Sequence, residues 1–553
     1  MQHRPMPLHG AGLSRRRLLA GGAAAGVVAV AAQLGGLGAS GAAAQAPGGG
    51  RLVERPGNLR DIVHWTALEL SAAIREKTVS CVEVMTAYLD QIDEFNPRVN
   101  AIVSLRPRAE LLAEAAGKDR LLANGGEPQG WMHGFPQAVK DLANVEGMKT
   151  TMGFFPLDSV EPAAADALFV ERVRAAGAIF IGKTNIPEFG LGSNTYNRVF
   201  PTTVNAYDLT KSAGGSSGGA AVAVAMRMLP VADGSDFFGS LRNPPGWNNV
   251  YGMRPSFGRV PRVGEAFVSQ GLVEGPIART AMDLARLLET MAGRDPRYPM
   301  SIDDGLAATD TLRGDVEGAK VAWLGDLGGY LPMEPEVLTV TARALGHFEA
   351  LRMPVTALDA LPTHGSFRGT EDLWPMWLTF RHWLVGSLLA PLAANEALRA
   401  AMKPEAVYEI EGLTEGANGN GPITALDVSL MSAKRTAMYR AFQELFEAYD
   451  YVALPTAQLF PFTVAGPGAM DWPAAIDGVA MSSYHRWMEV TSIATLLGAP
   501  AVAMPAGFSR SGLPIGLQVI GKHHDDAGVL RLAMAWDRQT SFVEGRRPPL
   551  LDG

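Results

Sequence analysis

Three side chains in this 553-residue chain have the types and the surroundings that acyl transfer needs. Ser216 and Ser240 lie in two separate Gly-rich stretches, and Lys140 lies well before both. A serine hydroxyl is a weak nucleophile until a nearby base takes its proton. Lysine can be that base only when it is neutral, which requires a pKa lowered by burial or by neighbouring cations. Together the three residues offer a nucleophile, a proton relay and a base without a histidine, which is typical of a hydrolase of amide-like bonds.

The backbone before Ser240 could supply the hydrogen-bond donors that this chemistry needs. Glycine lets the chain turn tightly and lets backbone N–H groups approach a ligand closely. Each N–H group that stabilises the oxyanion in acyl transfer lowers the barrier by about 3–4 kcal/mol. We therefore expect the segment Asp236–Ser240 to direct several N–H groups toward one point.

The Gly/Ser run Gly214–Gly219 has other interpretations when it is taken alone. Such runs are usually flexible loops, and the run itself does not match the GxxxxGK[ST] phosphate-binding motif. The run also matches the G-x-S-x-G nucleophile elbow, which requires a strand directly before the serine. The preceding segment Tyr207–Ser212 is typical of a turn, so we do not expect Ser216 to be an elbow nucleophile.

The elements that would position these residues alternate between helix and strand. An apolar strand over Phe135–Val139 would deliver Lys140 at its end, and a helix over Gly218–Met228 is followed by a strand over Leu229–Ala232. Further helices are predicted within 61–97, where Ser80 is a candidate cap, and over 108–123 and 164–175, with strands over 101–103 and 178–181. The pattern predicts an α/β fold with a central, mostly parallel mixed β-sheet that helices cover on both faces.

The first residues have the features of an export signal. Arg15, Arg16 and Arg17 precede an Ala/Gly/Val stretch, and Ala42–Ala44 is a plausible cleavage site. Two adjacent arginines are typical of the bacterial twin-arginine route. The alternative is a membrane anchor, but the apolar stretch is short and rich in glycine for a span. We therefore expect residues 1–46 to be a cleaved signal peptide and the protein to be periplasmic or secreted, with no stable membrane insertion afterwards.

Composition narrows the remaining choices. Residues 47–60 are predicted to be a linker and 61–553 one domain, in which 295–445 forms a variable insertion on the substrate side. The net charge of −8 argues against binding to nucleic acid. Cys81 is the only cysteine, so no disulfide can form within the chain. No HExxH motif or pair of CxxC motifs is present, and His523–Asp526 is typical of a solvated turn, so we expect no metal and no cofactor.

Taken as one ordered set, several motifs resemble the amidase signature family from about residue 60 to 300 and again from about 485 to 540. Besides the Gly/Ser run, they are Gly182–Phe189, Gly239–Pro244, Gly252–Ser256, Gly498–Ala501 and Gly512–Gln518. The resemblance implies a single large amidase-signature domain and a Ser–cisSer–Lys triad. Ser240 would be the nucleophile that forms the acyl-enzyme, Ser216 the proton relay after a cis peptide bond, and Lys140 the base.

The same resemblance implies supporting roles for neighbouring residues. The backbone N–H groups of Phe237, Phe238, Gly239 and Ser240 would form the oxyanion hole. Ser217, Gly215, Asp236 and Arg242 would support the catalytic residues from behind. The resemblance alone also implies a possible homodimer.

This chain departs from the family pattern in ways that concern the substrate. Phe238 stands where many relatives carry glycine, and Asn248–Asn249 replace small or apolar residues. Phe237 and Phe238 could simply pack in the core, or they could form an aromatic wall of the pocket. If the family layout holds, Met152, Phe154 and Phe155 would lie on the same side, and the substrate would be an apolar or aryl amide, with esters or carbamates sharing the chemistry.

Two other functions compete with an exported amidase. One is the A subunit of an amidotransferase that acts on glutamyl-tRNA in a complex, which the predicted signal and the acidic charge oppose. The other is a binding protein that kept the fold without catalysis, which the presence of Lys140, Ser216 and Ser240 opposes.

Overall fold

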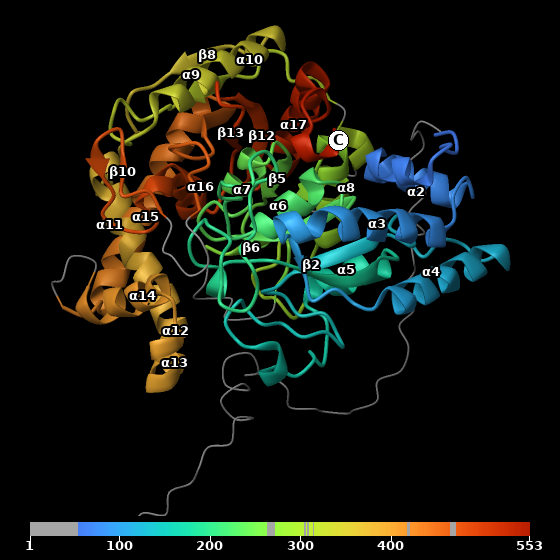
Figure 1. Ribbon diagram of the computed structural model, residues 1–553. Coiled ribbons are helices and arrows are strands. Elements are labelled where there is room, and N and C mark those ends of the chain that lie inside the picture. Colours follow the sequence, from blue (N-terminus) through green and yellow to red (C-terminus); the bar gives the residue numbers. More distant parts are fainter. Residues whose placement is uncertain are drawn as a thin grey trace, which may run out of the picture. The chain divides into compact units, whose positions relative to one another are not determined.

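A mixed eight-stranded sheet organises the computed structural model of the protein (Figure 1). The structure describes residues 53–262, 271–303, 306, 309–312, 314–416, 421–464 and 472–552, all within the unit Gly48–Gly553. In spatial order the strands are β4 (Val231–Asp236), β6 (Val273–Ala278), β5 (Tyr251–Arg254), β12 (Ala501–Phe508), β13 (Pro514–Ile520), β9 (Tyr451–Pro455), β7 (Val321–Trp323) and β8 (Val355–Ala357).

The direction of the strands differs in one respect from the sequence-based prediction. From β4 to β9 every neighbouring pair in this sheet is antiparallel, and only β7 runs parallel to its neighbours β9 and β8. The sheet is therefore mixed, but among the described strands it is mostly antiparallel instead of mostly parallel. The β12–β13 pair shows the reason, because five residues connect them, whereas a parallel pair needs a crossover of about a dozen residues or more.

A smaller sheet carries the lysine. Its strands are β1 (Ile102–Val103), β3 (Ile179–Thr184) and β2 (Pro136–Lys140), in that order, and β2 runs parallel to β3. The predicted strand before Lys140 is confirmed, with Lys140 as its last residue. The backbone N–H of Lys140 donates to Asp233 on β4 at 3.1 Å, so this sheet packs against the first strand of the large one. A separate hairpin pairs β10 (Ala475–Ile476) with β11 (Val479–Ala480).

Helices cover these sheets, and one of the N-terminal helices begins at the cap that the sequence predicts. Ser80 accepts the backbone N–H of Glu83, whose carboxylate accepts the N–H of Ser80 in return. The α-helices of the first part are α2 (Ala67–Arg75), α3 (Cys81–Val99), α4 (Arg108–Ala123), α5 (Leu168–Ala175), α6 (Gly218–Ala225), α7 (Asn243–Trp247) and α8 (Ala281–Met291). The helix predicted over 108–123 is confirmed with the same bounds, and Cys81 is buried as the first residue of α3.

The second part of the chain is mostly helical. It contains α9 (Pro335–Ala344), α10 (Gly346–Ala350), α11 (Thr370–Arg381), α12 (Ser387–Ala393), α13 (Glu396–Ala401), α14 (Pro404–Glu415), α15 (Ala425–Ala448), α16 (Ser492–Leu497), α17 (Asp526–Thr540) and α18 (Phe542–Gly545). A π-helical turn, His382–Gly386, joins α11 to α12. Short 3₁₀ turns occupy Leu59–His64, Leu157–Ser159, Glu188–Gly190, Thr309–Leu312, Arg486–Thr491 and Pro549–Leu551.

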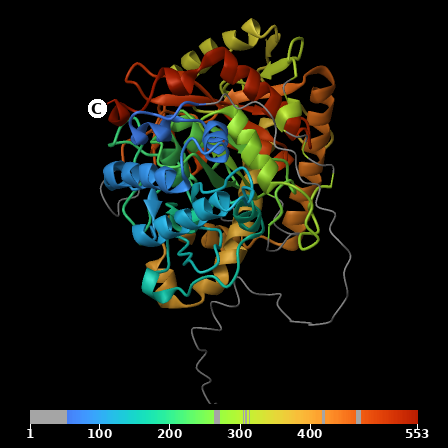
Figure 2. The ribbon, with the colours of Figure 1, turned by 90° about the vertical axis from the view of Figure 1, so that its right-hand side faces the viewer.

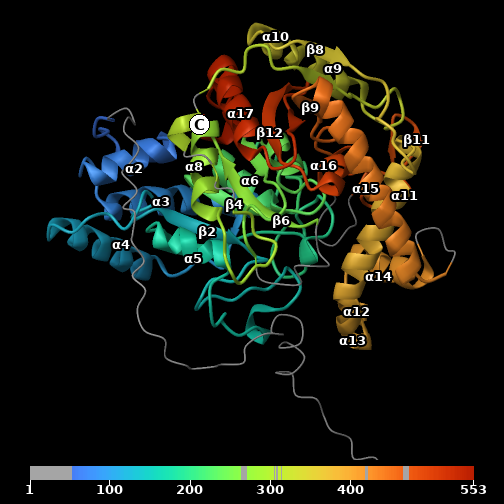
Figure 3. The same cartoon turned by 180° about the vertical axis from the view of Figure 1, so that it is seen from behind.

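Two groups of these helices lie on opposite sides of the sheet. Helices α2–α4 lie on one side and α11–α15 on the other, both from the front and from behind (Figures 1 and 3). The view turned by 90° shows the N-terminal helices, in blue, near the C-terminal segment, in red (Figure 2). Among the described helices, none combines the length and apolarity that crossing a membrane requires.

Candidate active site

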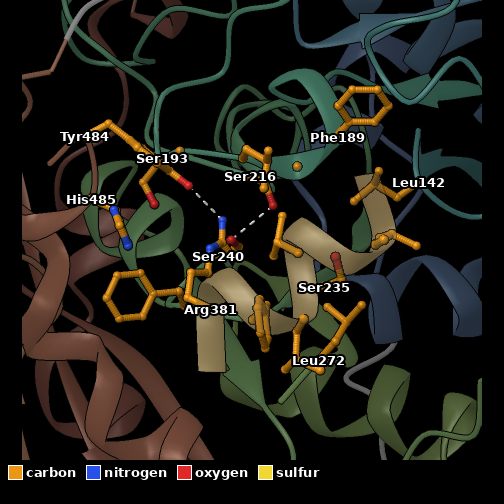
Figure 4. A pocket seen from close by; sticks show the side chains of 18 of the residues that line it. Leu142, Phe189, Ser193, Ser216, Ser235, Ser240, Leu272, Arg381, Tyr484 and His485 are labelled. Carbon is orange, nitrogen blue, oxygen red and sulfur yellow. Dashed lines mark hydrogen bonds between the residues drawn. The ribbon is translucent and has the colours of Figure 1, made fainter. Parts of the chain in front are cut away.

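The three residues that the sequence singled out lie in one chain of hydrogen bonds. Lys140 Nζ donates to Ser216 Oγ at 2.8 Å, and Ser216 Oγ lies 3.0 Å from Ser240 Oγ (Figure 4). All three side chains are buried. Because a hydroxyl group both donates and accepts, this arrangement provides a path for a proton from Ser240 to Lys140.

Each residue of this chain comes from a different element. Lys140 ends β2, and Ser240 lies in the turn that follows β4. Ser216 precedes α6 in the Gly-rich loop, and the peptide bond between Gly215 and Ser216 is cis, as the family resemblance implies. Isolated bridges, not a strand, precede this loop, which removes the elbow interpretation of Ser216.

The environment of Lys140 favours the neutral amine. Besides Ser216, the amine contacts Ser217 Oγ at 2.8 Å, Ser235 Oγ at 2.9 Å and the carbonyl oxygen of Ser235 at 3.2 Å. Burial lowers the pKa of Lys140, and this effect outweighs the acidic groups nearby, which raise it. The sequence analysis assigned Ser217 to this environment but missed Ser235, although Ser235 follows Asp233 at the two-residue spacing that places both on one face of a strand.

A buried carboxylate shapes the turn that holds Ser240. Asp236 accepts the backbone N–H groups of Gly239 at 3.0 Å and Leu241 at 3.1 Å, and it pairs with Arg242 and Arg254. Burial alone would raise the pKa of Asp236, but the two guanidinium groups outweigh it and hold the pKa well below the usual range. The carboxylate therefore stays ionised and fixes the turn from inside.

Gly239 is required in this turn for two reasons. Its φ is +99°, which L side chains rarely adopt. A Cβ atom at this position would also lie only 2.8 Å from Thr491 Oγ1. Thr491 in turn donates to the carbonyl oxygen of Phe238 at 3.1 Å, so the close approach of the two segments supports the turn.

The four N–H groups of the expected oxyanion hole are not equivalent. The N–H of Gly239 is occupied by Asp236. Those of Phe237, Phe238 and Ser240 have no acceptor within the described parts of the chain. These three groups are therefore the ones available to an oxyanion that forms at Ser240.

Ser216 and Ser240 face a largely apolar cavity of about 130 Å³. An apolar cavity of about 150 Å³ accommodates benzene, so the space suits a group the size of a phenyl ring. Its apolar lining consists of Leu142, Phe189, Leu191, Phe237, Phe238, Leu272, Leu384, Val385, Leu388, Leu389 and Met488. Arg381, Tyr484 and His485 supply polar groups to the same wall (Figure 4).

The aromatic residues expected in the pocket occupy two positions. Phe237 and Phe238 line the cavity, and Phe238 also stacks on Trp377 at 3.8 Å between ring centroids, so the wall and core interpretations both hold. Met152, Phe154 and Phe155 are not among the lining residues. Phe154 and Phe155 instead pack behind Phe189, whose ring centroid lies 4.7 Å from that of Phe154, and the backbone of Met152 holds the N–H of Phe189 at 2.8 Å.

Several lining residues were not predicted individually, although they belong to the region that the sequence assigns to the substrate side. Arg381, Leu384, Val385, Leu388 and Leu389 come from the end of α11, the π-helical turn and α12, inside the region 295–445 that carried no motif. Arg381 is buried with Glu409 at 2.9 Å and Tyr484 at 3.0 Å. No local pattern in the sequence indicates that this helix would reach the cavity.

Within the described ranges, no group of three or more His, Cys, Asp or Glu side chains could hold a metal ion. In the segment His523–Asp526, Asp525 caps α17 through the N–H of Gly528 at 2.9 Å. His523 and His524 form a turn, as the sequence predicts, but Asp526 is buried and pairs with Arg259 at 3.0 Å, so the segment is only partly solvated.

Comparison with known proteins shows the family to which the chain belongs. A family model described as Amidase matches residues 83–530. The chain is 34% identical over 477 residues to an acylamidase from Rhodococcus erythropolis, covering 85% of this chain and 94% of the relative. A solved structure of a bacterial aryl acylamidase of the amidase signature family aligns with a TM-score of 0.78 at 28% identity, covering 87% of this chain and 99% of that one. The chain therefore belongs to the amidase signature family, whose members hydrolyse amide bonds, and it is an amide hydrolase.

A different activity is represented among the relatives as well. The chain is 34% identical over 518 residues to the A subunit of the glutamyl-tRNA(Gln) amidotransferase from Moorella thermoacetica, covering 89% of this chain and 99% of the relative. Sequence similarity alone therefore does not identify the substrate, so we infer the substrate from the residues that line the cavity.

Proposed function

We propose that the protein hydrolyses apolar or aryl amides through an acyl-enzyme on Ser240. The observation that carries the proposal is the hydrogen-bonded path from Ser240 Oγ through Ser216 Oγ to Lys140 Nζ, which opens on a mainly apolar cavity. Esters and carbamates pass through the same tetrahedral chemistry, so we expect some turnover of them.

In the acylation half of the reaction, Ser240 Oγ attacks the carbonyl carbon of the amide. Its proton passes to Ser216, whose own proton passes to neutral Lys140. The negative charge that develops on the carbonyl oxygen is stabilised by the N–H groups of Phe237, Phe238 and Ser240. The C–N bond then breaks, and the leaving amine takes the proton back from Lys140 through Ser216.

Deacylation repeats these roles with water as the nucleophile. Water attacks the acyl carbon and gives its proton to Lys140 through Ser216. The C–O bond to Ser240 breaks, Ser240 Oγ recovers the proton, and the acid leaves. Each half-reaction returns Lys140 to its neutral state, so one relay serves both.

A substrate panel tests the preference for apolar groups. Wild type and Phe238→Ala are assayed with acetamide, anilides, peptide amides, esters and carbamates. Because Phe238 lines the cavity, we expect wild type to prefer anilides and Phe238→Ala to lose much of that preference. Unchanged ratios between acetamide and an anilide in the variant would contradict an aromatic binding wall.

The likeness to the amidotransferase protein supports a second candidate, in which glutamine is the amide donor within a complex. The mainly apolar lining opposes it, because free glutamine carries two charges that need partners. Ammonia release from glutamine that exceeds turnover of anilides by the isolated chain would favour this candidate.

A further inference from the structure

Strand register places an acidic residue beside the buried lysine. Strands β4 and β6 pair antiparallel, with Ser235 directly opposite Glu274. Side chains of directly opposed residues leave the sheet on the same face, with Cβ atoms about 4.5–5.5 Å apart. Ser235 Oγ lies 2.9 Å from Lys140 Nζ. Glu274 therefore projects from the face of the sheet that Lys140 contacts.

Two neighbours confirm which face this is. Alternate residues along a strand share a face, and Leu272, which directly precedes β6, lines the cavity together with Ser235 (Figure 4). Asp233, two residues before Ser235, accepts the backbone N–H of Lys140. The face that carries Glu274 is thus the one that meets the end of β2.

The other acidic groups near Lys140 already bind partners of their own. Glu274, Asp233 and Asp236 all raise the pKa of Lys140, and Glu274 has the largest effect of the three. Asp236 is paired with two arginines. Asp233 accepts from the backbone of Lys140 and from Gln137, and its pKa is raised by burial.

The Glu274 carboxyl group lies among charges that act on its pKa in both directions. Burial raises the pKa of Glu274, while Arg262 and Lys140 lower it and Asp233 raises it further. Tyr298 also lies within electrostatic range. Glu274 is partly exposed, whereas Asp233 and Asp236 are buried. Of the three acids, Glu274 can therefore change its charge with the smallest effect on the fold.

We propose that the Glu274 carboxylate is the counter-charge that stabilises Lys140 after Lys140 accepts the serine proton, and that it sets the pH below which the lysine stops working as a base. The inference rests on the proposed role of Lys140. Glu274 forms and breaks no bond in the reaction, and it is a positioning residue that acts through Lys140. Without its charge, Lys140 would be neutral down to lower pH but would also be a weaker base.

The experiment compares pH profiles of kcat/KM for wild type, Glu274→Gln, Glu274→Met and Glu274→Asp. We expect the acid limb of both neutral variants to move to lower pH by about one unit, the low end of what a nearby opposite charge produces, with a lower plateau. Glu274→Asp should keep the limb near that of wild type. Glu489→Gln is the matched control, because burial raises the pKa of Glu489 to about 7 but Glu489 is not among the groups that act on Lys140.

The outcomes separate this inference from the proposed function. An acid limb that coincides with wild type in either neutral variant, at an unchanged melting temperature, overturns the role of Glu274. A shift of the same size in Glu489→Gln also overturns it. In contrast, full activity in Lys140→Met would refute the role of Lys140 itself.

Discussion

Lys140 has to be neutral for the proposed chemistry, and its surroundings are suited to that purpose. Three oxygen atoms from Ser216, Ser217 and Ser235 lie within 2.9 Å of the amine, and none of them carries a negative charge. Burial lowers the pKa, since the charged form loses its hydration. The acids nearby limit how far the pKa falls, which keeps the amine basic enough to accept a proton.

The pH dependence of activity follows from this environment. Neutral Lys140 is the active form, and protonation removes it, so kcat/KM should fall as the pH drops through the lowered pKa of Lys140. The rate should stay high above that pKa until another group titrates. The measurement is kcat/KM for an anilide from mildly alkaline to acidic pH, across the pKa of Lys140 of about 8, and a rate that stays flat down to acidic pH contradicts the assignment.

Removal of the Ser235 hydroxyl tests the residue that the sequence analysis missed. Ser235→Ala removes one hydrogen bond from Lys140 but leaves the backbone carbonyl contact in place. A hydrogen bond to a group that becomes charged is worth about 1.5–3 kcal/mol, so kcat/KM should fall by roughly tenfold or more. Ser159→Ala, an exposed serine far from this chain of contacts, is the control and should behave as wild type.

Local sequence patterns predict some of the helices and strands but not how they are arranged. The strand that ends at Lys140 and the capped helix α3 are predictable, because an apolar run and a capping box are local signals. The order and direction of the strands are not, because pairing between distant segments leaves no period in the sequence. For the same reason the sequence assigns the region 295–445 to the substrate side but does not indicate which residues of α11 and the π-helical turn line the cavity.

A buried network fixes these helices against the cavity. Glu409 on α14 pairs with Arg381 at 2.9 Å and contacts His382 at 2.9 Å, and both partners lie where α11 meets the π-helical turn. Burial would raise the pKa of Glu409, but Arg381 and His382 outweigh it and keep the pKa well below its usual range. The carboxylate thus stays charged and ties α14 to the wall of the cavity.

We expect loss of this carboxylate to destabilise the protein strongly. Glu409→Ala leaves Arg381 buried without its partner, which costs about 3–5 kcal/mol of the free energy of unfolding. The matched control is Glu317→Ala, whose partner Arg352 has a side chain that is 74% exposed, and little or no change in the free energy of unfolding is expected there. Urea denaturation measures both, and equal losses would contradict the role of the buried network.

At the scale of the whole molecule, the resemblance of the motifs predicted the family, and the alternation of helix and strand patterns predicted the α/β fold. The chemistry-bearing residues were predictable because the motifs that hold them are short and Gly-rich, as the turns require. The residues that line the pocket were harder to predict. Met152, Phe154 and Phe155 are close to the lysine segment in sequence, but Phe189 lies between them and the cavity.

Export remains a prediction of the sequence, and we propose that the first 46 residues direct it. The measurement is the distribution of activity between cytoplasm and periplasm in a bacterial host. Replacement of Arg15 and Arg16 by lysine should retain the protein in the cytoplasm in active form. Equal export of wild type and variant would contradict a twin-arginine signal.

The most direct test of the proposed mechanism is the identity of the residue that carries the acyl group. The enzyme is quenched in acid during turnover of a slowly deacylated aryl ester, and its peptides are mapped by mass spectrometry. We predict an acyl adduct on Ser240 in wild type and no adduct or turnover in Ser240→Ala, although that variant should melt at the same temperature. An adduct on Ser216, or undiminished turnover by Ser240→Ala, would contradict the account.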